Sequence, residues 1–461
     1  MKPSDLTRRN LLKNAGRTLL LPAIPALSGR VAGAAEDQPI GWRNWSGGQS
    51  CNPRDRIAPG SEEELAGVLA QASGTIRLVG AGHSFSPLVP TDDTIISLAK
   101  MSGLIDSDAA AQQATFWAGT RMADMGKPLQ DIGQGLINMA DIDRQILAGA
   151  ISTSTHGTGA KLGSASSYVT ALSILTASGE VIECDAETNP EIFQAARVAL
   201  GSLGVITRIT VQNRERYRLK ETIWAEEIES VLARDAELRD GNRHFEMFPM
   251  VHSDMAIVQS INITDEKPTA SVVADDDGGE DLMRFLQDYG GIFPWLRRWA
   301  INWFVGQMEA IDIVGESYDI LSNVRNTRFN EMEYEIPLQA GPECLREILR
   351  TIEKHNVDIA FPLEYRYVRE DDIWLSMFHG RDSCAISVHQ FADIDYRPYF
   401  DLIEPIFWKY EGRPHWGKLH TLKADRLRSL YPKWQEFLEV RESLDPTGRF
   451  LNDHLHGVFG I

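Results

Sequence analysis

The sequence predicts an α+β protein of two or three domains. Its 461 residues, 43% of them hydrophobic, are enough for a full core in each domain, and the composition lacks the bias of a disordered or fibrous chain. Helix and strand signals alternate from Pro59 to about Asn213, and longer strand patterns with amphipathic helices follow. We therefore expect the first domain boundary near Asn213.

A capped helix opens the first half of the chain. In SEEELAGVLAQAS, Ser61 can cap the helix and Glu64 can close a capping box. TIRLVG is typical of a buried strand, and TIISLA and a helix near residues 122–132 continue the alternation. ALSILTASGEVIEC predicts a hairpin that turns at Ser178-Gly179, and NPEIFQAARVALGSLGVITRITVQ predicts a capped helix, a glycine break and a β-branched strand.

Two features stand out in the second half. The acidic stretch ADDDGGED, residues 274–281, predicts a surface loop rather than a domain linker. The stretch IFPWLRRWAINWFVG places Trp295, Trp299 and Trp303 four residues apart, on one face of a helix. Such a stripe faces the core more often than it forms a docking patch for a membrane or an electron acceptor, so we expect it to be buried.

The N-terminus has the features of an export signal. Arg8-Arg9 precede a short apolar run, residues 19–27, which is too short to span a bilayer, and Ala32-Gly33-Ala34 suits a signal peptidase. Residues 7–13, TRRNLLK, resemble a twin-arginine signal, with leucine where phenylalanine is commoner. The resemblance implies export of the folded protein to the periplasm or the outside of the cell, with no integral membrane segment after cleavage. The alternative is an exposed basic amphipathic tail.

Cleavage after residue 34 would make the chain more acidic. It removes six basic residues and one acidic residue, which changes the formal net charge from −19 to −24. A charge of this sign argues against nucleic acid or anionic lipid as a partner.

Three glycine-bearing stretches suggest a phosphate-bearing ligand. RLVGAGHSFSP, residues 77–87, follows a strand signal with two glycines, whose backbone N–H groups can approach a phosphate closely. The third glycine of a Rossmann motif is missing and Pro87 follows, so a nicotinamide-binding domain is disfavoured. DIDRQILAGAISTSTHGTGAKLGS, residues 141–164, adds glycines and hydroxyl groups, and ALGSLGVIT, residues 199–207, is the third stretch.

Together these stretches resemble the flavin-binding domain of the vanillyl-alcohol oxidase superfamily, in its branch of sugar-lactone and alditol oxidases. The resemblance implies bound FAD, carried by the imidazole of His83 on the 8-methyl carbon of the flavin ring. Since no cysteine lies in the second stretch, a single covalent link is implied. The alternative for His83 is a turn histidine bonded to backbone. The implied FAD-binding residues are Val79, Gly80, Ala81, Gly82, His83, Ser84, Gly149, Ser152, Thr153, Thr155, His156, Gly157, Gly159, Gly204, Val205, Ile206 and Lys418.

The C-terminal part carries a second resemblance. GRPHWGKLH, residues 412–420, and LDPTGRFLNDHL, residues 444–455, resemble the closing motifs of the aldonolactone oxidases, and PLEYRYV matches their E-x-R pair at Glu364 and Arg366. The resemblance implies that Lys418 reaches flavin and substrate, that Arg366 binds the substrate oxygen and that Glu364 orients it. Residues two apart on a strand face the same side, as a joint role requires. The alternatives are a surface ion pair and a solvated lysine.

Three histidines are further candidates. His389, in CAISVHQF, resembles the strand histidine of alditol oxidases and is a candidate base or orienting residue, although Phe391 stands where a hydroxyl is expected. His156 and His415 are conspicuous, but packing explains them equally well, so neither is expected to be a base.

Nothing in the spacing of histidines, acids or cysteines indicates a metal site. The four cysteines are scattered, so neither zinc nor disulfides are expected, and small core residues are the simplest interpretation; they are Cys51, Cys184, Cys344 and Cys384.

The resemblances imply a two-part FAD-binding domain and a substrate domain with a large antiparallel sheet. The expected ranges are 1–34 for the signal, 35–213 for FAD, 214–400 for substrate and 401–461 for a segment that returns to the flavin. The implied reaction is oxidation of the secondary alcohol of an aldono-1,4-lactone, with an alditol as second choice. A flavin-containing binding or electron-transfer protein is the alternative. No motif distinguishes oxygen from another acceptor such as a cytochrome or quinone.

We predict that replacing both Arg8 and Arg9 by lysine traps an uncleaved, FAD-loaded precursor in the cytoplasm, because the twin-arginine route requires the arginine pair. Cell fractionation and immunoblotting measure this, with Lys2→Arg as the control. Unchanged processing of the double variant would mean that the signal is of another type.

Overall fold

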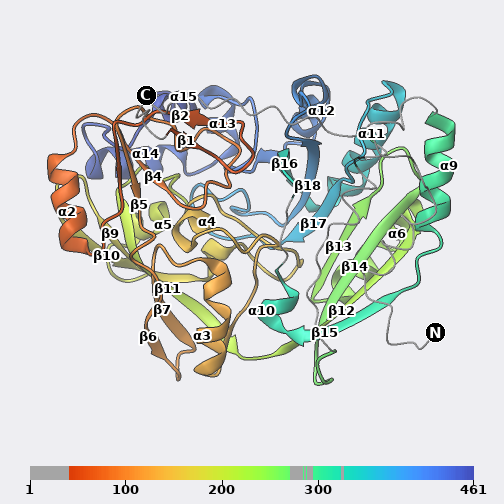
Figure 1. Ribbon diagram of the computed structural model, residues 1–461, viewed down its shortest axis with the longest axis horizontal. Helices are drawn as coiled ribbons and strands as arrows, with labels where there is room; N and C mark the ends of the chain where they lie inside the picture. The colour runs from red at the N-terminus through yellow and green to blue at the C-terminus, as the bar shows by residue number, and fades with distance from the viewer. Residues whose placement is uncertain (1–40, 270–283, 285–286, 288–293, 323–326) are drawn as a thin grey trace, which may run out of the picture.

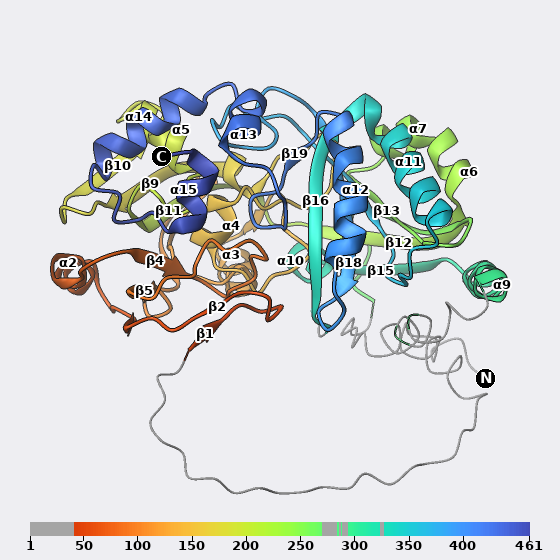
Figure 2. The same ribbon diagram turned by 90° about the horizontal axis from the view of Figure 1, so that it is seen from above.

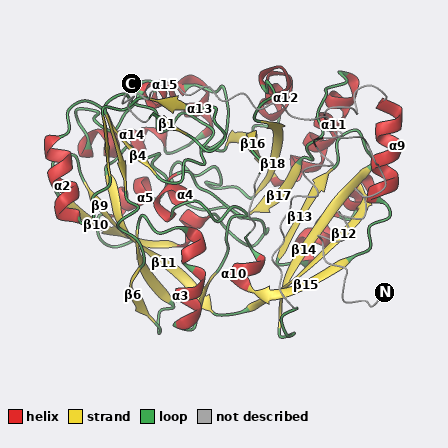
Figure 3. Ribbon diagram, viewed as in Figure 1, coloured by secondary structure: helices red, strands yellow, loops and turns green. Residues whose placement is uncertain are grey.

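The computed structural model describes residues 41–269, 284, 287, 294–322 and 327–461. Two groups of strands lie side by side, one formed by the first half of the chain and one by the second (Figure 1). In Figure 3 many of the connecting loops gather in the centre, between these two groups. No helix of the described residues has both the length and the apolar character needed to cross a membrane.

The N-terminal part, residues 41–215, contains two main sheets. A parallel three-stranded sheet has the order β3-β5-β4, and a six-stranded antiparallel sheet has the order β10-β9-β11-β7-β6, with β8 paired to β11. A short pair, β1 and β2, precedes them. The strands are β1 Trp42–Arg43, β2 Ser50–Cys51, β3 Asp55–Ile57, β4 Ile76–Val79, β5 Thr94–Ser97, β6 Leu104–Asp108, β7 Gln113–Trp117, β8 Gln134–Leu136, β9 Val169–Leu175, β10 Val181–Asp185 and β11 Val205–Glu215.

The helices of this part agree with the sequence signals. Ser61 caps α2 by accepting a hydrogen bond from the Glu64 backbone N–H at 3.1 Å, whereas the Glu64 carboxylate accepts from Gly60 rather than from Ser61. The predicted hairpin is β9–β10, and strand β11 continues past Asn213 to Glu215. The helices are α2 Glu62–Gln71, α3 Gly126–Asp131, α4 Leu147–Ser152 and α5 Pro190–Ala196, with short 3-10 turns at Met122–Asp124 and Ala165–Tyr168.

The second part is built on an eight-stranded sheet of order β15-β12-β14-β13-β17-β18-β16-β19, in which every neighbouring pair is antiparallel. This confirms the predicted antiparallel sheet. The strands are β12 Arg218–Glu227, β13 His244–Pro249, β14 Met255–Thr264, β15 Ile311–Glu316, β16 Phe329–Pro337, β17 Glu364–Val368, β18 Ser383–Phe391 and β19 Arg413–Pro414.

Helices α6, α7, α11 and α12 cover one face of this sheet (Figure 2). The opposite face therefore meets the N-terminal part, and the backbone N–H of Gly159 bonds to Tyr367 of β17 at 2.7 Å across this boundary. The helices of the second part are α6 Ile228–Ala233, α7 Asp235–Gly241, α9 Pro294–Val305, α10 Ser317–Ile320, α11 Gly341–Lys354 and α12 Arg397–Lys409, with a 3-10 turn at Leu338–Ala340.

The C-terminal segment returns to the N-terminal part, where its helices lie beside the first sheets (Figure 2). These helices are α13 Ala424–Leu430, α14 Trp434–Leu444 and α15 Asp453–Phe459. The buried guanidinium of Arg77 fixes this return by donating to four backbone carbonyls, those of Leu88, Leu200, Gly201 and Phe450. One side chain thus ties two glycine-bearing loops to the end of the chain.

Two tryptophans of the stripe, Trp299 and Trp303, are not in the core. Helix α9 forms as predicted, but the side chains of Trp299 and Trp303 are 61% and 54% exposed and stack on each other. The buried side chains among the described positions of α9 are Arg297, Ile301 and Val305, which are four residues apart. The core expectation is therefore wrong for these two tryptophans, because the helix turns this other face inward. The side chain of Trp295 and the stretch 274–281 lie outside the described residues.

Three cysteines are buried and unpaired as expected, Cys184, Cys344 and Cys384, while Cys51 is half-buried.

Replacing Arg77 by methionine should lower the free energy of unfolding by roughly 3 kcal/mol or more, because four buried carbonyls lose their donor. Denaturant unfolding measures this difference. The control is Arg43→Met, at an exposed arginine, where a change within about 0.5 kcal/mol is expected. Equal effects of the two substitutions would contradict the role given to Arg77.

Candidate active site

A large cavity lies where the three glycine-bearing stretches meet the C-terminal segment. Its empty volume is about 1330 Å³, and it is open to solvent. The walls come from residues 77–85 after β4, from the stretch around α4, from residues 199–206 before β11, and from His415, Gly417 and Lys418. Segments distant in sequence therefore build one site.

The cavity wall presents free donors to a ligand. The backbone N–H groups of Ala81, Gly82, His83 and Ser84 have no acceptor among the described residues. Gly82 has φ +72°, and Gly204 has φ +141° with the Leu175 carbonyl 2.8 Å from where a Cβ would lie, so both positions require glycine. An array of backbone donors without side chains in front of it fits the phosphates of a dinucleotide such as FAD.

His83 lies on this wall without a hydrogen-bond partner in the described part of the chain, and its ring is 5.2 Å from that of Trp45. Burial, together with the charges of Lys418 and Arg144, lowers the pKa of His83 to about 4. The imidazole is therefore neutral at neutral pH, with one ring nitrogen free to form a bond.

A second cavity, of about 920 Å³ empty volume, adjoins the first against the open face of the large sheet. Five residues line both cavities: Ile142, Gln145, Thr155, His415 and Lys418. A ligand in one cavity would therefore touch the same side chains as a ligand in the other.

The sheet wall of the second cavity carries an unusual density of charge. Strand β16 turns Glu331, Glu333 and Glu335 to the same face, and all three are buried. In the sheet register Glu333 is opposite Ser387, which is opposite Glu364 on the far side. Burying three carboxyl groups requires cations nearby.

Lysine and arginine supply most of this compensation. Lys418 pairs with Glu331, and its Nζ lies 3.8 Å from Oε2 of Glu333. Arg366 donates to Glu333, and its Nη2 lies 3.4 Å from Oε2 of Glu364. Glu364 and Arg366 are both buried, so they are not the surface pair considered above.

These contacts set the protonation of the acids. Burial opposes ionisation of Glu331, but Lys418 and His389 outweigh it and lower the pKa of Glu331 to about 2. The pKa of Glu333 is likewise held well below its usual value, because Arg366 and His156 outweigh the effect of burial. Burial raises the pKa of Glu364.

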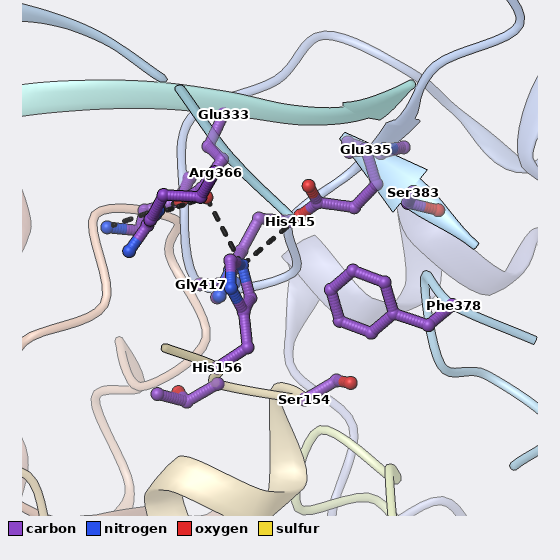
Figure 4. A network of polar contacts seen from close by, with 12 residues as sticks. Ser154, His156, Glu333, Glu335, Arg366, Phe378, Ser383, His415 and Gly417 are labelled. Atoms are coloured by element: carbon purple, nitrogen blue, oxygen red, sulfur yellow. Dashed lines mark hydrogen bonds and ion pairs between the residues drawn. The ribbon is translucent and has the colours of Figure 1, made fainter. Parts of the chain in front are cut away.

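His156 and His415 are neighbours, with ring centroids 5.7 Å apart (Figure 4), but they differ in protonation state. His415 accepts a hydrogen bond at Nδ1 from the Gly417 backbone N–H at 3.0 Å, and burial lowers its pKa to about 3, so it is neutral. His156 donates from Nδ1 to the Gly157 carbonyl at 2.8 Å, while its Nε2 lies 3.2 Å from Oε1 of Glu333. With a carbonyl at Nδ1 and carboxylates close to Nε2, the pKa of His156 is raised to about 9, and the ring carries two protons.

His389 lines the second cavity and projects from β18. Its Nδ1 lies 3.3 Å from the carbonyl oxygen of Pro362, which can only accept, and its Nε2 lies 3.5 Å from Oε1 of Glu331. Phe391 points elsewhere, packing on Phe361 with ring centroids 4.4 Å apart.

The structure brings together most of the residues that the sequence singled out. The large cavity is lined by Val79, Gly80, Ala81, Gly82, His83, Ser84, Gly149, Ser152, Thr153, Thr155, Gly204, Ile206 and Lys418. The second cavity is lined by Glu364, Arg366, His389 and Lys418.

Four of the proposed FAD-binding residues do not line the large cavity. His156 belongs to the second cavity. Gly157 and Gly159 serve close packing instead, since an added Cβ would lie 2.1 Å from the Met139 carbonyl and 2.7 Å from the Arg243 carbonyl respectively. Val205 is a fully buried core residue of β11.

Sequence reasoning missed Gln145 and the three glutamates of β16. The alternation FNEMEYEIP does signal a strand with one charged face, but such a face is normally interpreted as solvent-exposed. The fold also gathers two groups of possible metal ligands that linear spacing did not show, His156-Glu333-His415 and Glu331-Glu364-His389. In each group a glutamate is already paired with Arg366 or Lys418.

Comparison with known proteins shows the family to which the chain belongs. Residues 209–458, more than half of the chain, match the model of the family D-arabinono-1,4-lactone oxidase, and residues 53–185 match an FAD binding domain. The chain belongs to the D-arabinono-1,4-lactone oxidase family. The residues matched to the FAD binding domain include the loop after β4 and the stretch around α4, both of which line the large cavity.

Similar curated proteins match almost the whole chain. L-gulono-1,4-lactone dehydrogenase of Mycobacterium tuberculosis is 36% identical over 91% of this chain and 99% of its own length. L-gulonolactone oxidase of Bos taurus is 33% identical over 91% and 98%, and alditol oxidase of a Streptomyces species is 25% identical over 90% and 98%. The relatives are thus oxidoreductases of sugar lactones and alditols.

Among solved structures, cholesterol oxidase from Brevibacterium sterolicum superimposes with a TM-score of 0.77 at 14% sequence identity, covering 95% of this chain and 100% of that one. This likeness confirms the two-part fold.

Proposed function

We propose that this lactone oxidase family member oxidises the secondary alcohol of an aldono-1,4-lactone, with FAD as the hydride acceptor. One observation carries the proposal: the FAD cavity meets, at Lys418, a second cavity whose wall holds the buried pair Glu364 and Arg366. Removing a hydride and a proton from a carbinol needs a base for the proton, and a donor such as Arg366 beside the alcohol oxygen stabilises the negative charge that develops there. Relatives named for gulonolactone and arabinonolactone support the choice of lactone.

The FAD site would be formed by the loop N–H groups of residues 81–84 and by the glycines before β11. FAD supplies a two-electron acceptor, which no side chain of the chain can replace. His83, neutral and unpaired, is suited to a covalent link to the flavin ring. Oxygen or another acceptor would then take the electrons, in keeping with relatives named as oxidase and as dehydrogenase.

Three basic residues of the second cavity would have defined tasks. Arg366 donates a hydrogen bond to the alcohol oxygen, held in place by Glu333 and Glu364. Lys418 keeps a positive charge at the junction of the two cavities. His389 takes the hydroxyl proton at Nε2, since its Nδ1 faces a carbonyl, and Glu331 stabilises the imidazolium that forms.

An alditol is the second candidate substrate, because His389 lines the cavity as its resemblance to the alditol oxidases requires. Anaerobic mixing of the holoenzyme with a panel of aldonolactones and alditols separates the two, since the substrate class bleaches the flavin absorbance. Bleaching by neither class would support a flavin-containing binding or electron-transfer protein instead.

We predict that the flavin stays attached after denaturation and that His83→Ala abolishes the attachment. Flavin fluorescence of the protein band on a denaturing gel measures this. His454→Ala, at a histidine outside both cavities, is the control and should keep the fluorescent band. A fluorescent His83→Ala band would show that another residue carries the flavin.

Arg366→Lys should slow anaerobic flavin reduction by lactone about a hundredfold, because lysine keeps the charge facing Glu333 but lacks the planar donor fork. Alanine is unsuitable here, since it would leave a buried carboxylate unpaired. Stopped-flow absorbance measures the rate. The matched control is Arg413→Lys, a buried arginine that binds backbone carbonyls outside both cavities. A rate within about twofold of wild type for Arg366→Lys would refute its role.

A further inference from the structure

Glu335 has no place in the mechanism above. It is fully buried at the end of the β16 row, lines neither cavity, and neither of its carboxyl oxygens has a hydrogen-bond partner in the described structure. An unpaired buried carboxyl group destabilises a protein, and a nonpolar residue would fit the same strand position without that penalty.

The nearest cation is His156, which stands between two carboxyl groups. Its Nε2 lies 3.8 Å from Oε1 of Glu335 and 3.2 Å from Oε1 of Glu333 (Figure 4). Neither contact has hydrogen-bond geometry, so both are ion-pair contacts, and one N–H is shared between the two acids. Since Nδ1 donates to a carbonyl, the imidazole cannot turn over without losing that bond.

Glu333 connects this pair to the substrate cavity. The same carboxylate that faces His156 accepts from Arg366. The sheet register adds a second connection, because Ala385 is opposite Glu335 on one side and Arg366 on the other. A chain of charges therefore runs from the sealed interior, through Glu335, His156 and Glu333, to the guanidinium that meets the substrate.

We propose that Glu335 and His156 are positioning residues that set how tightly Glu333 holds Arg366, and hence how strongly Arg366 binds the alcohol oxygen. When Glu335 is protonated, the imidazolium of His156 interacts mainly with Glu333. The guanidinium of Arg366 is then free to bind substrate. When Glu335 releases its proton to solvent, the imidazolium is drawn toward it, and the charge of Glu333 falls on Arg366 alone. The proposal rests on the proposed function.

The surroundings favour a change of protonation near neutral pH. Burial and the neighbouring charge of Glu333 raise the pKa of Glu335 to about 7. Burial lowers the pKa of His156, but Glu333 and Glu335 outweigh it and raise it to about 9. The titratable and charged groups that interact electrostatically with Glu335 are Glu333 on its own strand, His156 after α4, Arg366 on β17, Arg381 before β18, Cys384 on β18 and Tyr431 after α13.

The kinetic test follows anaerobic flavin reduction of the holoenzyme by L-gulono-1,4-lactone between pH 5.5 and 8.5. In the wild type the substrate concentration for half-maximal rate should rise about tenfold across pH 7, a 1.4 kcal/mol loss of binding, with the limiting rate less affected. Glu335→Gln should lack this rise. If the glutamine variant does not fold, Glu335→Ala takes its place and should also lack the rise. Glu404→Gln, at a buried glutamate on the helical side of the sheet, should keep it. The same rise in both Glu335 variants would overturn the proposal.

A second measurement needs no substrate. Because the folded protein holds a proton on Glu335 that the unfolded chain releases, the wild type should lose stability relative to Glu335→Gln as pH rises from about 4.5 to 7, and no further above. The difference in melting temperature between the two proteins measures this, and a constant difference would refute the titration of Glu335.

The kinetic test distinguishes failure of the proposed function from failure of the coupling between Glu335 and Arg366. If no lactone reduces the flavin, the proposed function is wrong, and the coupling to substrate is refuted with it. If lactone reduces the flavin but the pH profiles coincide, only the coupling is wrong.

Discussion

The burial of three carboxyl groups on strand β16 is the constraint on which the site depends. A buried carboxylate is tolerated only beside cations, and none of the cations comes from β16 itself. Arg366 comes from β17, Lys418 from the C-terminal segment and His156 from the stretch after α4. The wall of the second cavity is therefore complete only when the sheet, the N-terminal part and the end of the chain are assembled together.

A similar dependence fixes the wall of the FAD cavity. Among the residues that the structure describes, the guanidinium of Arg77 has no carboxylate partner, and it is satisfied by carbonyls from three loops, one of them near the end of the chain. Backbone carbonyls cannot rearrange as freely as side chains, so these bonds fix the loops relative to one another. The geometry around His83 is thus a property of the whole fold rather than of its own loop.

How much the sequence predicted depended on whether the signal was local. Ser61 and the Ser178-Gly179 turn act within a few residues, and the structure has the cap and the hairpin there. The E-x-R pair was identified by its resemblance to the aldonolactone oxidases, and the two-residue repeat of a strand predicted only that both side chains share a face. Glu331, Glu333 and Glu335 were missed because alternation gives one face of a strand but not whether water or protein covers it. The predicted burial of Trp299 and Trp303 was wrong for the same reason. Helical spacing placed the two side chains on one face without showing which face of α9 meets the sheet.

The path of the chain around the FAD cavity has a consequence for the timing of biosynthesis. The loop that carries His83 leaves the ribosome early, whereas the covering residues 415–418 come near the end of the chain. At the usual elongation rate the loop waits roughly 20 to 60 seconds for this cover. A nascent chain therefore lacks part of the pocket wall, and the complete cavity is offered to the cofactor only by the finished polypeptide.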